Sequence, residues 1–439
     1  MVLAGREEGT NCMNSTPPIH LGNKPRWRRA TRLKALVATG AIALGFAGMG
    51  LAASGPALAD PSVNYVLTGS DTIQDVMNGF ALTEGNILGS YNAVNPVDGT
   101  AHQIITPSKV PVGAVSPVTT CSFIRPNGST EGSAALDFSL TGNTTNLNSL
   151  APALVPGPPQ SNCVDIARSS SAPKSATSSA CTPTPTVLCQ SATGGLVFIP
   201  FALDAVGGAV GGTSNITQAN LFTSADLTTL YSGCNVVTEG GVTYWPSGST
   251  VTQPAGSTVI DLYIPQNGSG TEKFWASKVG MTLNSDGSFS STQFPCVKQT
   301  IVGTTTAVEE HNGLAVSTDP NGYMPFSIAQ WIAQSNGIDD RRHGAVLTAI
   351  NGVAPTNAGP TLNTAFPFTR EVYLVTAFDR VVSGVDTNFD ATLSGLLTGT
   401  SSVLCRAAFT IRQYGFATLG TPTTTDNCGS TASTLRAVE

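Results

Sequence analysis

The stretch that decides the fold is Thr258-Val-Ile-Asp-Leu-Tyr-Ile-Pro-Gln-Asn-Gly-Ser-Gly-Thr-Glu-Lys-Phe-Trp275. Its residues up to Ile264 are largely apolar and β-branched, which predicts a buried strand. Two glycines then bracket a serine, and the residues from Thr271 onward predict an amphipathic helix. This order leaves backbone N–H groups and two hydroxyls at the positive end of a helix dipole, which favours an anion or a polyol. Because Gly and Ser are also ordinary turn residues, a purely structural role stays open for this turn alone.

Three further strand-to-helix turns carry the same hydroxyl chemistry. They are Thr68-Gly-Ser-Asp-Thr72, Asn127-Gly-Ser-Thr-Glu-Gly132 and Arg168-Ser-Ser-Ser-Ala-Pro173. Each follows an apolar run that is typical of a strand: Tyr65–Leu67, Cys121–Ile124 and Cys163–Ala167. Strands that alternate with helices predict an α/β protein. Turns at the carboxyl ends of parallel strands share a sheet edge, so we expect the four turns to converge on one ligand.

Length and composition indicate an exported protein with two domains. The chain has 439 residues, which is enough for two cores, and only 11% of them are charged. Residues 60–439 hold 14 basic and 25 acidic side chains. Such a surface repels nucleic-acid phosphates, and no basic patch with interleaved aromatics is present in the sequence. Nucleic acid is therefore disfavoured as a partner.

Residues 1–59 are predicted to be a signal peptide with a long leader. Arg26–Lys34 is a basic region, Ala35–Ala53 is apolar, and Ala57-Leu-Ala59 is the small-x-small pattern that a signal peptidase cleaves. A membrane anchor is the alternative, because the apolar run is nearly long enough to span a bilayer. No cysteine stands at the cleavage position, which disfavours a lipoprotein anchor. We expect a secreted or cell-envelope-associated monomer with no membrane span after cleavage.

The eight cysteines beyond residue 59 predict disulfides, since an even number in an exported protein is typical of a disulfide framework. Close Cys-x-x-Cys pairs, which a zinc site needs, are absent from the sequence. Eight cysteines allow 105 pairings, so the connectivity is open. Their order along the chain favours Cys121–Cys163, Cys181–Cys189, Cys234–Cys296 and Cys405–Cys428.

Two apolar runs, each interrupted by a proline, predict two crossings between the domains. They are Gly195–Asp204 and Thr364–Thr376, and a proline prevents such a strand from staying central throughout. The expected first domain is discontinuous, 60–200 plus 369–439, with 201–368 inserted. The predicted helices are Ile73–Leu82 with Ser70 or Asp71 as N-cap, Gly132–Phe138, Leu221–Tyr231 and Ser327–Gln334.

Enzymatic and metal chemistry have less support in the sequence. No Gly-x-Ser-x-Gly elbow occurs, and nothing marks a Ser–His–Asp set. His311 beside Glu309 and Glu310 suggests a metal ligand, but we expect a solvated loop there. Arg125 and Arg168 lie at or just before two of the turns. Each is expected to form either a bidentate contact to an oxyanion or a structural ion pair.

As a set, the four turns resemble those of the phosphate-binding proteins of ABC importers, and most of all their secreted actinobacterial relatives. The resemblance covers residues 63–380 and implies a periplasmic-binding-protein type 2 fold, in which two α/β lobes close on ligand about two hinge crossovers. No cofactor is implied. With Asp71 and the two arginines added, the resemblance gives the ligand set Ser70, Asp71, Thr72, Arg125, Ser129, Arg168, Ser170, Ser171, Ser269, Gly270 and Thr271.

Two positions depart from that family. Pro265 stands where an arginine is usual, and Ser171 replaces the aspartate that accepts the proton of bound phosphate. Arg168 could supply the missing cation. The expected function is capture of a small oxyanion, phosphate or a relative, and its delivery to an ABC permease without covalent chemistry. The alternative is a secreted or wall-associated interaction protein that keeps the fold without transport.

Overall fold

A computed structural model of the chain describes residues 62–85, 87–96, 99–110, 119–178, 181, 188–216, 222–284, 287–385, 387–419 and 428–437. The predicted signal peptide lies outside these residues. Among them, no helix combines the length and apolarity needed to cross a bilayer.

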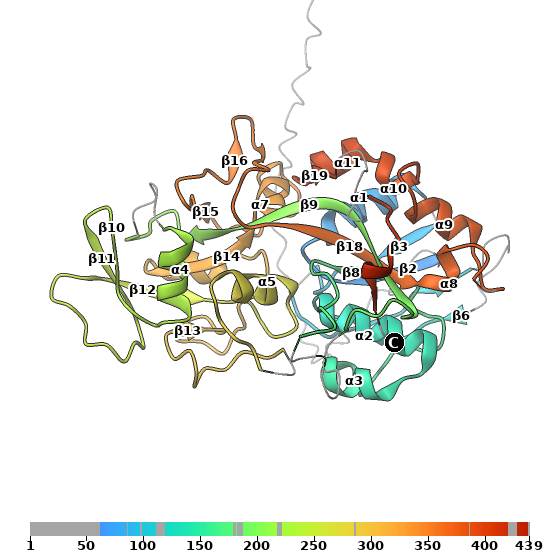
Figure 1. Ribbon diagram of the computed structural model, residues 1–439, viewed down its shortest axis with the longest axis horizontal. Coiled ribbons are helices and arrows are strands. Elements are labelled where there is room, and N and C mark those ends of the chain that lie inside the picture. The colour runs from blue at the N-terminus through green and yellow to red at the C-terminus, as the bar shows by residue number, and fades with distance from the viewer. Residues whose placement is uncertain are drawn as a thin grey trace, which may run out of the picture. The chain divides into compact units, whose positions relative to one another are not determined.

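The fold is α/β, and one large mixed sheet runs through the described residues (Figure 1). Its path is β10 (Val237–Glu239), β11 (Val242–Pro246), β12 (Thr258–Tyr263), β14 (Gly322–Ser327), β9 (Leu196–Val210), β18 (Thr369–Ala377), β8 (Ile166–Ser169), β2 (Tyr65–Gly69) and β3 (Leu88–Ser90). β13 (Val297–Lys298) pairs with β12, while β15 (Val346–Leu347), β19 (Ala417–Thr418) and β20 (Arg436–Ala437) pair with β9.

Short strands and helices complete the described structure. Three small sheets contain β1 (Ser62–Val63), β5 (Ser108–Lys109) and β6 (Thr119–Thr120); β4 (Ile104–Ile105) and β7 (Phe123–Ile124); and β16 (Thr356–Asn357) and β17 (Thr361–Leu362). The helices are α1 (Gln74–Thr83), α2 (Ser129–Thr141), α3 (Thr144–Leu150), η1 (Pro152–Leu154), α4 (Ser224–Tyr231), α5 (Gly270–Lys278), α6 (Leu314–Thr318), α7 (Ile328–Ser335), α8 (Phe378–Val381), α9 (Ala391–Leu397), α10 (Val403–Arg406), α11 (Ala408–Gln413) and η3 (Ser433–Leu435).

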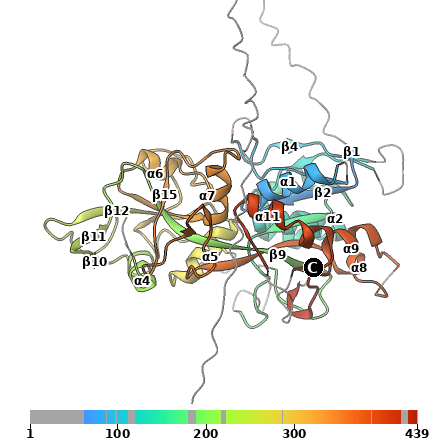
Figure 2. The same cartoon turned by 90° about the horizontal axis from the view of Figure 1, so that it is seen from above.

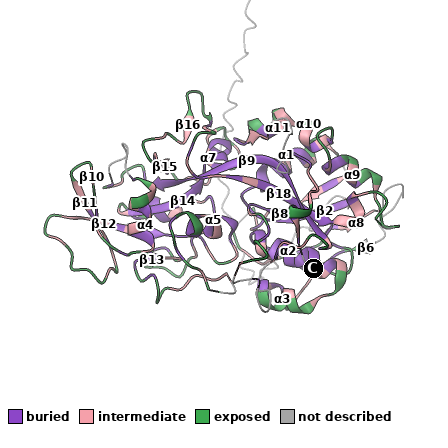
Figure 3. Cartoon of the chain, in the orientation of Figure 1, coloured by how far each residue is buried: buried purple, intermediate pink, exposed green. Residues whose placement is uncertain are grey.

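Two lobes share this sheet, and β9 and β18 run from one to the other (Figures 1 and 2). Lobe 1 contains β2, β3, β8, α1, α2 and the helices from α8 onward, and lobe 2 contains β10 to β15 and α4 to α7. The first part of β9, up to Ala205, pairs with β18, and the part from Val206 pairs with β14. Each lobe has its own apolar clusters. Figure 3 shows this burial along the central strands. The first lobe is therefore discontinuous, whereas the boundaries at 200 and 369 stay a prediction.

The expectation for Pro200 is confirmed, because β9 crosses between the lobes and, within the described residues, no strand pairs with its second edge at Pro200. β9 pairs with β18 on one edge, where the register shifts between Val372 and Tyr373. On the other edge, β20 pairs at Val197 and β19 pairs from Ala202. The proline lacks an N–H group, and it lies in the gap between these two short strands, where no ladder hydrogen bond is needed.

Several predicted element ends are wrong. Helix α1 begins at Gln74 without a side-chain cap, so neither Ser70 nor Asp71 is its N-cap. The Asp71 side chain instead lies among buried polar groups of the opposite lobe. Helix α2 starts at Ser129, earlier than predicted, and the strand expected over Cys121–Ile124 shortens to β7. The strand β12 matches its prediction closely.

Four disulfides join the eight cysteines of the described residues, and their pairing is the one that chain order favoured. The pairs are Cys121–Cys163, Cys181–Cys189, Cys234–Cys296 and Cys405–Cys428. The first fastens β7 to the segment before β8, so it holds together the strands that lead into two of the four turns.

Candidate functional site

The Gly-Ser-Gly-Thr turn after β12 is shaped by its residue types. Ser269 is the N-cap of α5, and its hydroxyl accepts a hydrogen bond of 2.9 Å from the Glu272 N–H group. A Cβ atom on Gly270 would lie 2.1 Å from Ser170 Oγ and 2.5 Å from Ser129 Oγ. Only glycine therefore lets this turn of lobe 2 approach the two serine hydroxyls of lobe 1.

The three turns of lobe 1 also contact one another. The Ser70 N–H group donates to the Arg168 carbonyl at 3.1 Å. Ser129 Oγ lies 3.2 Å from Ser170 Oγ and accepts from the Ser170 N–H group at 3.0 Å. Across the lobes, Thr72 Oγ1 lies 3.5 Å from the hydroxyl of Thr271.

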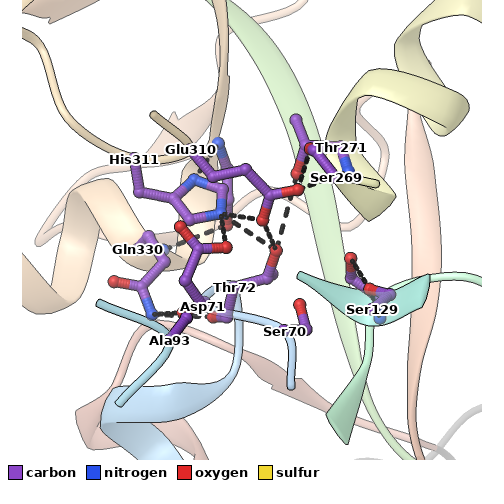
Figure 4. Close-up of polar contacts among 12 residues, drawn as sticks. Ser70, Asp71, Thr72, Ala93, Ser129, Ser269, Thr271, Glu310, His311 and Gln330 are labelled. Carbon is purple, nitrogen blue, oxygen red and sulfur yellow. Dashed lines mark hydrogen bonds and ion pairs between the residues drawn. The ribbon is translucent and has the colours of Figure 1, made fainter. Parts of the chain in front are cut away.

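The four turns thus converge, and we call six of their buried hydroxyl residues the cradle. Each is at most 2% exposed, and Figure 4 shows Ser70 between Thr72 and Ser129. The Ser70 hydroxyl is buried and has no hydrogen-bond partner among the described residues. The cradle residues are Ser70, Thr72, Ser129, Ser170, Ser269 and Thr271.

The cradle holds a carboxylate of the chain itself, that of Glu310 (Figure 4). Its Oε1 accepts a hydrogen bond from the Thr271 N–H group at 2.9 Å and another from the Ser269 hydroxyl. Its Oε2 accepts from Thr72 Oγ1 at 3.1 Å. Glu310 is 2% exposed and His311 is fully buried, so the expected solvated loop is wrong. A helix N-terminus and two hydroxyls here bind an oxyanion group.

Asp71 and Glu310 lie in one buried cluster, and their pKa values are shifted in opposite directions. Burial and the charge of Glu310 raise the pKa of Asp71 well above its ordinary value. Burial alone would raise the pKa of Glu310 as well. However, hydrogen bonds from Asp71 and His311, with the positive charge of Arg370, hold it well below its usual range. The pKa of Asp71 is thus raised and that of Glu310 lowered within one buried cluster, which favours the charge on Glu310 over that on Asp71.

His311 completes this network and decides its chemistry. The ligand atoms of Asp71, Glu310 and His311 lie within 4.8 Å of one another, as a metal site requires. However, the Ser327 N–H group donates to His311 Nδ1 at 3.3 Å, which places the ring hydrogen on Nε2. A metal-bound nitrogen carries no hydrogen, and the other ring nitrogen normally donates. The same hydrogen prevents His311 from acting as a base for Thr72, whose Oγ1 lies 2.9 Å from Nε2. We interpret the cluster as a hydrogen-bond network.

A buried ion pair supplies the cation of the site. Asp204 on β9 and Arg370 on β18 are register partners at the crossing, and their side chains meet at 2.9 Å. Arg370 Nη2 also donates to Thr271 Oγ1 at 2.9 Å and to Thr72 Oγ1 at 3.3 Å. Its Nη1 is buried without a hydrogen-bond partner among the described residues. Arg370 therefore supplies the cation that the sequence analysis expected from Arg168.

The structure gives both predicted arginines other partners. Arg168 is fully buried, and it donates to the carbonyls of Ser70 at 2.9 Å, Gly69 at 3.0 Å and Tyr91 at 2.7 Å. It thus shapes the first turn from behind. Arg125 donates to the Asn92 carbonyl at 2.7 Å. We leave both arginines out of the proposed ligand set.

A cavity of about 340 Å³ lies beside the cradle. Its lining includes Ser170, Ser171, Lys174, Lys273, Arg370 and Glu371. Ser171, which is only partly buried, thus faces this cavity and lies outside the cradle. Three cations and one acid among these residues give the cavity a positive character, which suits the approach of an anion.

Sequence reasoning missed four residues of the site: Asp204, Glu310, Gln330 and Arg370. Gln330 on α7 donates to the Thr72 carbonyl at 2.7 Å. The sequence did contain a signal for Asp204 and Arg370, because each is a charged residue within an otherwise apolar strand. Nothing local marked Glu310, since its role depends on where its loop lies.

Comparison with known proteins gives similarities of fold only. No protein-family model matches the chain, and neither does any curated protein. A possible phosphate-binding protein from Planctomyces limnophilus is similar, with 11% identity, a TM-score of 0.34, and coverage of 82% of this chain and 94% of that one. A phosphate-binding protein from Stenotrophomonas maltophilia has 12% identity, a TM-score of 0.36, and coverage of 84% and 96%. OxyR from Corynebacterium glutamicum has 10% identity, a TM-score of 0.32, and coverage of 81% and 65%.

Proposed function

We propose that the protein is an exported solute-binding protein that captures a small oxyanion, phosphate or a relative, in the cradle and delivers it to an ABC permease. The observation that carries this proposal is the convergence of four hydroxyl turns on one buried point at the N-terminus of α5. Neutral O–H and N–H donors bind an oxyanion there with one nearby cation, Arg370.

The occupant of the cradle supports its chemistry. A carboxylate is itself an oxyanion, and Glu310 is bound by the same kind of donors that a solute would use. The unpartnered Ser70 hydroxyl is a further donor for a ligand with more oxygen atoms than a carboxylate. A tetrahedral oxyanion has such oxygens.

A solute has a way to this point. The cavity shares Ser170 with the cradle, and Arg370 borders both. Hinge motion at β9 and β18 would part the turns of the two lobes and expose the hydroxyls. Binding then consists of lobe closure around the solute, and no covalent step is needed.

Calorimetric titration of the purified protein with phosphate, sulfate and molybdate tests this proposal. The double variant Ser269→Ala/Thr271→Ala removes two cradle hydroxyls and is expected to lose the oxyanion. Ser269 is also a helix cap, so a cap control is required. Thr223→Ala removes the matching cap of α4, whose hydroxyl accepts from the Asp226 N–H group at 3.1 Å. Loss of either cap costs about 1 kcal/mol of stability, but only the double variant Ser269→Ala/Thr271→Ala should alter oxyanion binding.

A second function is favoured by one observation, the internal occupant. Because Glu310 of lobe 2 bonds to Thr72 of lobe 1, the two lobes are bridged without a solute. A secreted interaction protein that keeps the closed fold would show this arrangement permanently. Absence of heat with every oxyanion, in wild type and in a variant that lacks the Glu310 carboxylate, would favour this second function.

A further inference from the structure

The Glu310 carboxylate has the hydrogen-bond environment of a bound ligand. Two donors reach Oε1, the Thr271 N–H group and the Ser269 hydroxyl. Oε2 lies 3.1 Å from Thr72 Oγ1 and 3.3 Å from His311 Nε2. Burial of a carboxylate is costly unless it is paired and hydrogen-bonded, and these donors are what offset that cost for Glu310.

The neighbouring carboxylate behaves differently. Glu309 is only partly buried, and it reaches the Asn127 amide at 3.3 Å without contacting a cradle hydroxyl. Two adjacent glutamates therefore cross to lobe 1 from one loop, and only the second enters the cradle. Glu309 is therefore a matched control for substitutions of Glu310.

We infer that Glu310 is an intramolecular ligand of the cradle, and that an external oxyanion binds there only by displacing its carboxylate. The inference rests on the proposed function, because both concern the same donors. The α5 N-terminus and Ser269 cannot serve both groups at once. Glu310 and the cradle residues are each at most 2% exposed, so the carboxylate is enclosed by the donors that it occupies.

Displacement has two consequences. The solute competes with a group that is tethered at high effective concentration. The apparent affinity for the solute therefore equals its intrinsic affinity multiplied by the small fraction of molecules in which the carboxylate has left the cradle. Loss of the carboxylate also breaks the bridge to Thr72, so Glu310 couples solute entry to separation of the lobes. Affinity is thereby set by one side chain outside the four turns.

Glu310→Ala tests this inference, with Glu309→Ala as control. Removal of the side chain leaves space for a small carboxylate between the same donors. We expect phosphate to bind Glu310→Ala at least about tenfold more tightly than wild type, as measured by calorimetry. We also expect sodium acetate to raise the thermal midpoint of Glu310→Ala, but not that of wild type or Glu309→Ala, relative to sodium chloride at equal concentration.

The outcomes separate the two proposals. Equal phosphate affinity in wild type and Glu310→Ala, with no acetate effect, overturns the inference and leaves the proposed function standing. Binding of acetate or phosphate by Glu310→Ala alone overturns capture by the native protein and supports the inference. No binding by either protein overturns both. If Glu310→Ala does not fold, Glu310→Gln is used: it keeps the shape without the charge and is expected to bind phosphate more tightly than wild type.

Discussion

Replacement of Asp204 by alanine is expected to destabilise the protein more than any single surface substitution. Asp204 is fully buried, and Oδ2 accepts from Arg370 Nε at 3.1 Å and Nη2 at 2.9 Å. Its Oδ1 accepts from Ser327 Oγ at 2.8 Å and the Ala329 N–H group at 3.1 Å. Asp204→Ala leaves the Arg370 charge, with its side chain 3% exposed, without a counterion. Breaking a buried pair from one side costs about 3–5 kcal/mol.

Urea unfolding followed by fluorescence measures this loss, provided that the slope with denaturant stays constant. Asp340→Ala is the matched control, because it removes a carboxylate paired with Arg342 at 2.8 Å but about half exposed; its expected cost is below about 1 kcal/mol. The double variant Asp204→Ala/Arg370→Met should lose less than the sum of its single variants by about 2 kcal/mol. A loss below about 1 kcal/mol for Asp204→Ala would refute the view that this pair holds the hinge.

Three further predictions concern packing, cross-links and protons. Gly270→Ala should cost more than about 2 kcal/mol, since its Cβ would lie 2.1 Å from Ser170 Oγ, whereas Gly395→Ala in α9, with no atom near its Cβ, should stabilise by about 0.5–1 kcal/mol in the same urea assay. Removal of Cys234–Cys296, with a sequence separation of 62, should cost about 2 kcal/mol more than removal of Cys181–Cys189, with a separation of 8, by thermal unfolding. The pKa of Asp71 is higher in the folded protein than in the unfolded chain. Protonated Asp71 therefore contributes stability that is fully present below the unfolded pKa and is lost as pH rises through the folded pKa. The stability of Asp71→Asn minus that of wild type should therefore grow as pH rises above the unfolded pKa of about 4, by up to about 1.4 kcal/mol per pH unit, and a constant difference would contradict the raised pKa.

The turns were predictable because their information is local. A glycine beside serine and threonine, after an apolar strand and before a helix, fixes both a backbone shape and a set of donors. The cysteine pairs followed from chain order for a similar reason, since each closes a contiguous segment. Convergence of the four turns required only that their strands belong to one α/β arrangement.

The remaining site residues depend on register and on loop placement. Asp204 meets Arg370 only because β9 and β18 pair antiparallel in one register, and a shift by one residue would place them on opposite faces. Glu310 is a polar residue in a polar stretch, and only the tertiary fold distinguishes it from Glu309. The N-cap expected at Asp71 is wrong because this side chain lies beside His311 of the opposite lobe, away from the start of α1.

An empty cradle is costly for a closed protein, because buried donors without an acceptor lose their bonds to water and gain none in return. A solute removes this cost in a binding protein, and the lobes otherwise stay apart. Here the chain places an acceptor of its own among the donors, so closure needs no solute. The affinity for any external oxyanion is then the difference between two sets of similar hydrogen bonds. A solute can win only through contacts that a carboxylate cannot make, and the unpartnered Ser70 hydroxyl and Arg370 Nη1 are groups of the described residues that could provide them. Both favour an oxyanion with more than two oxygens over a simple carboxylate.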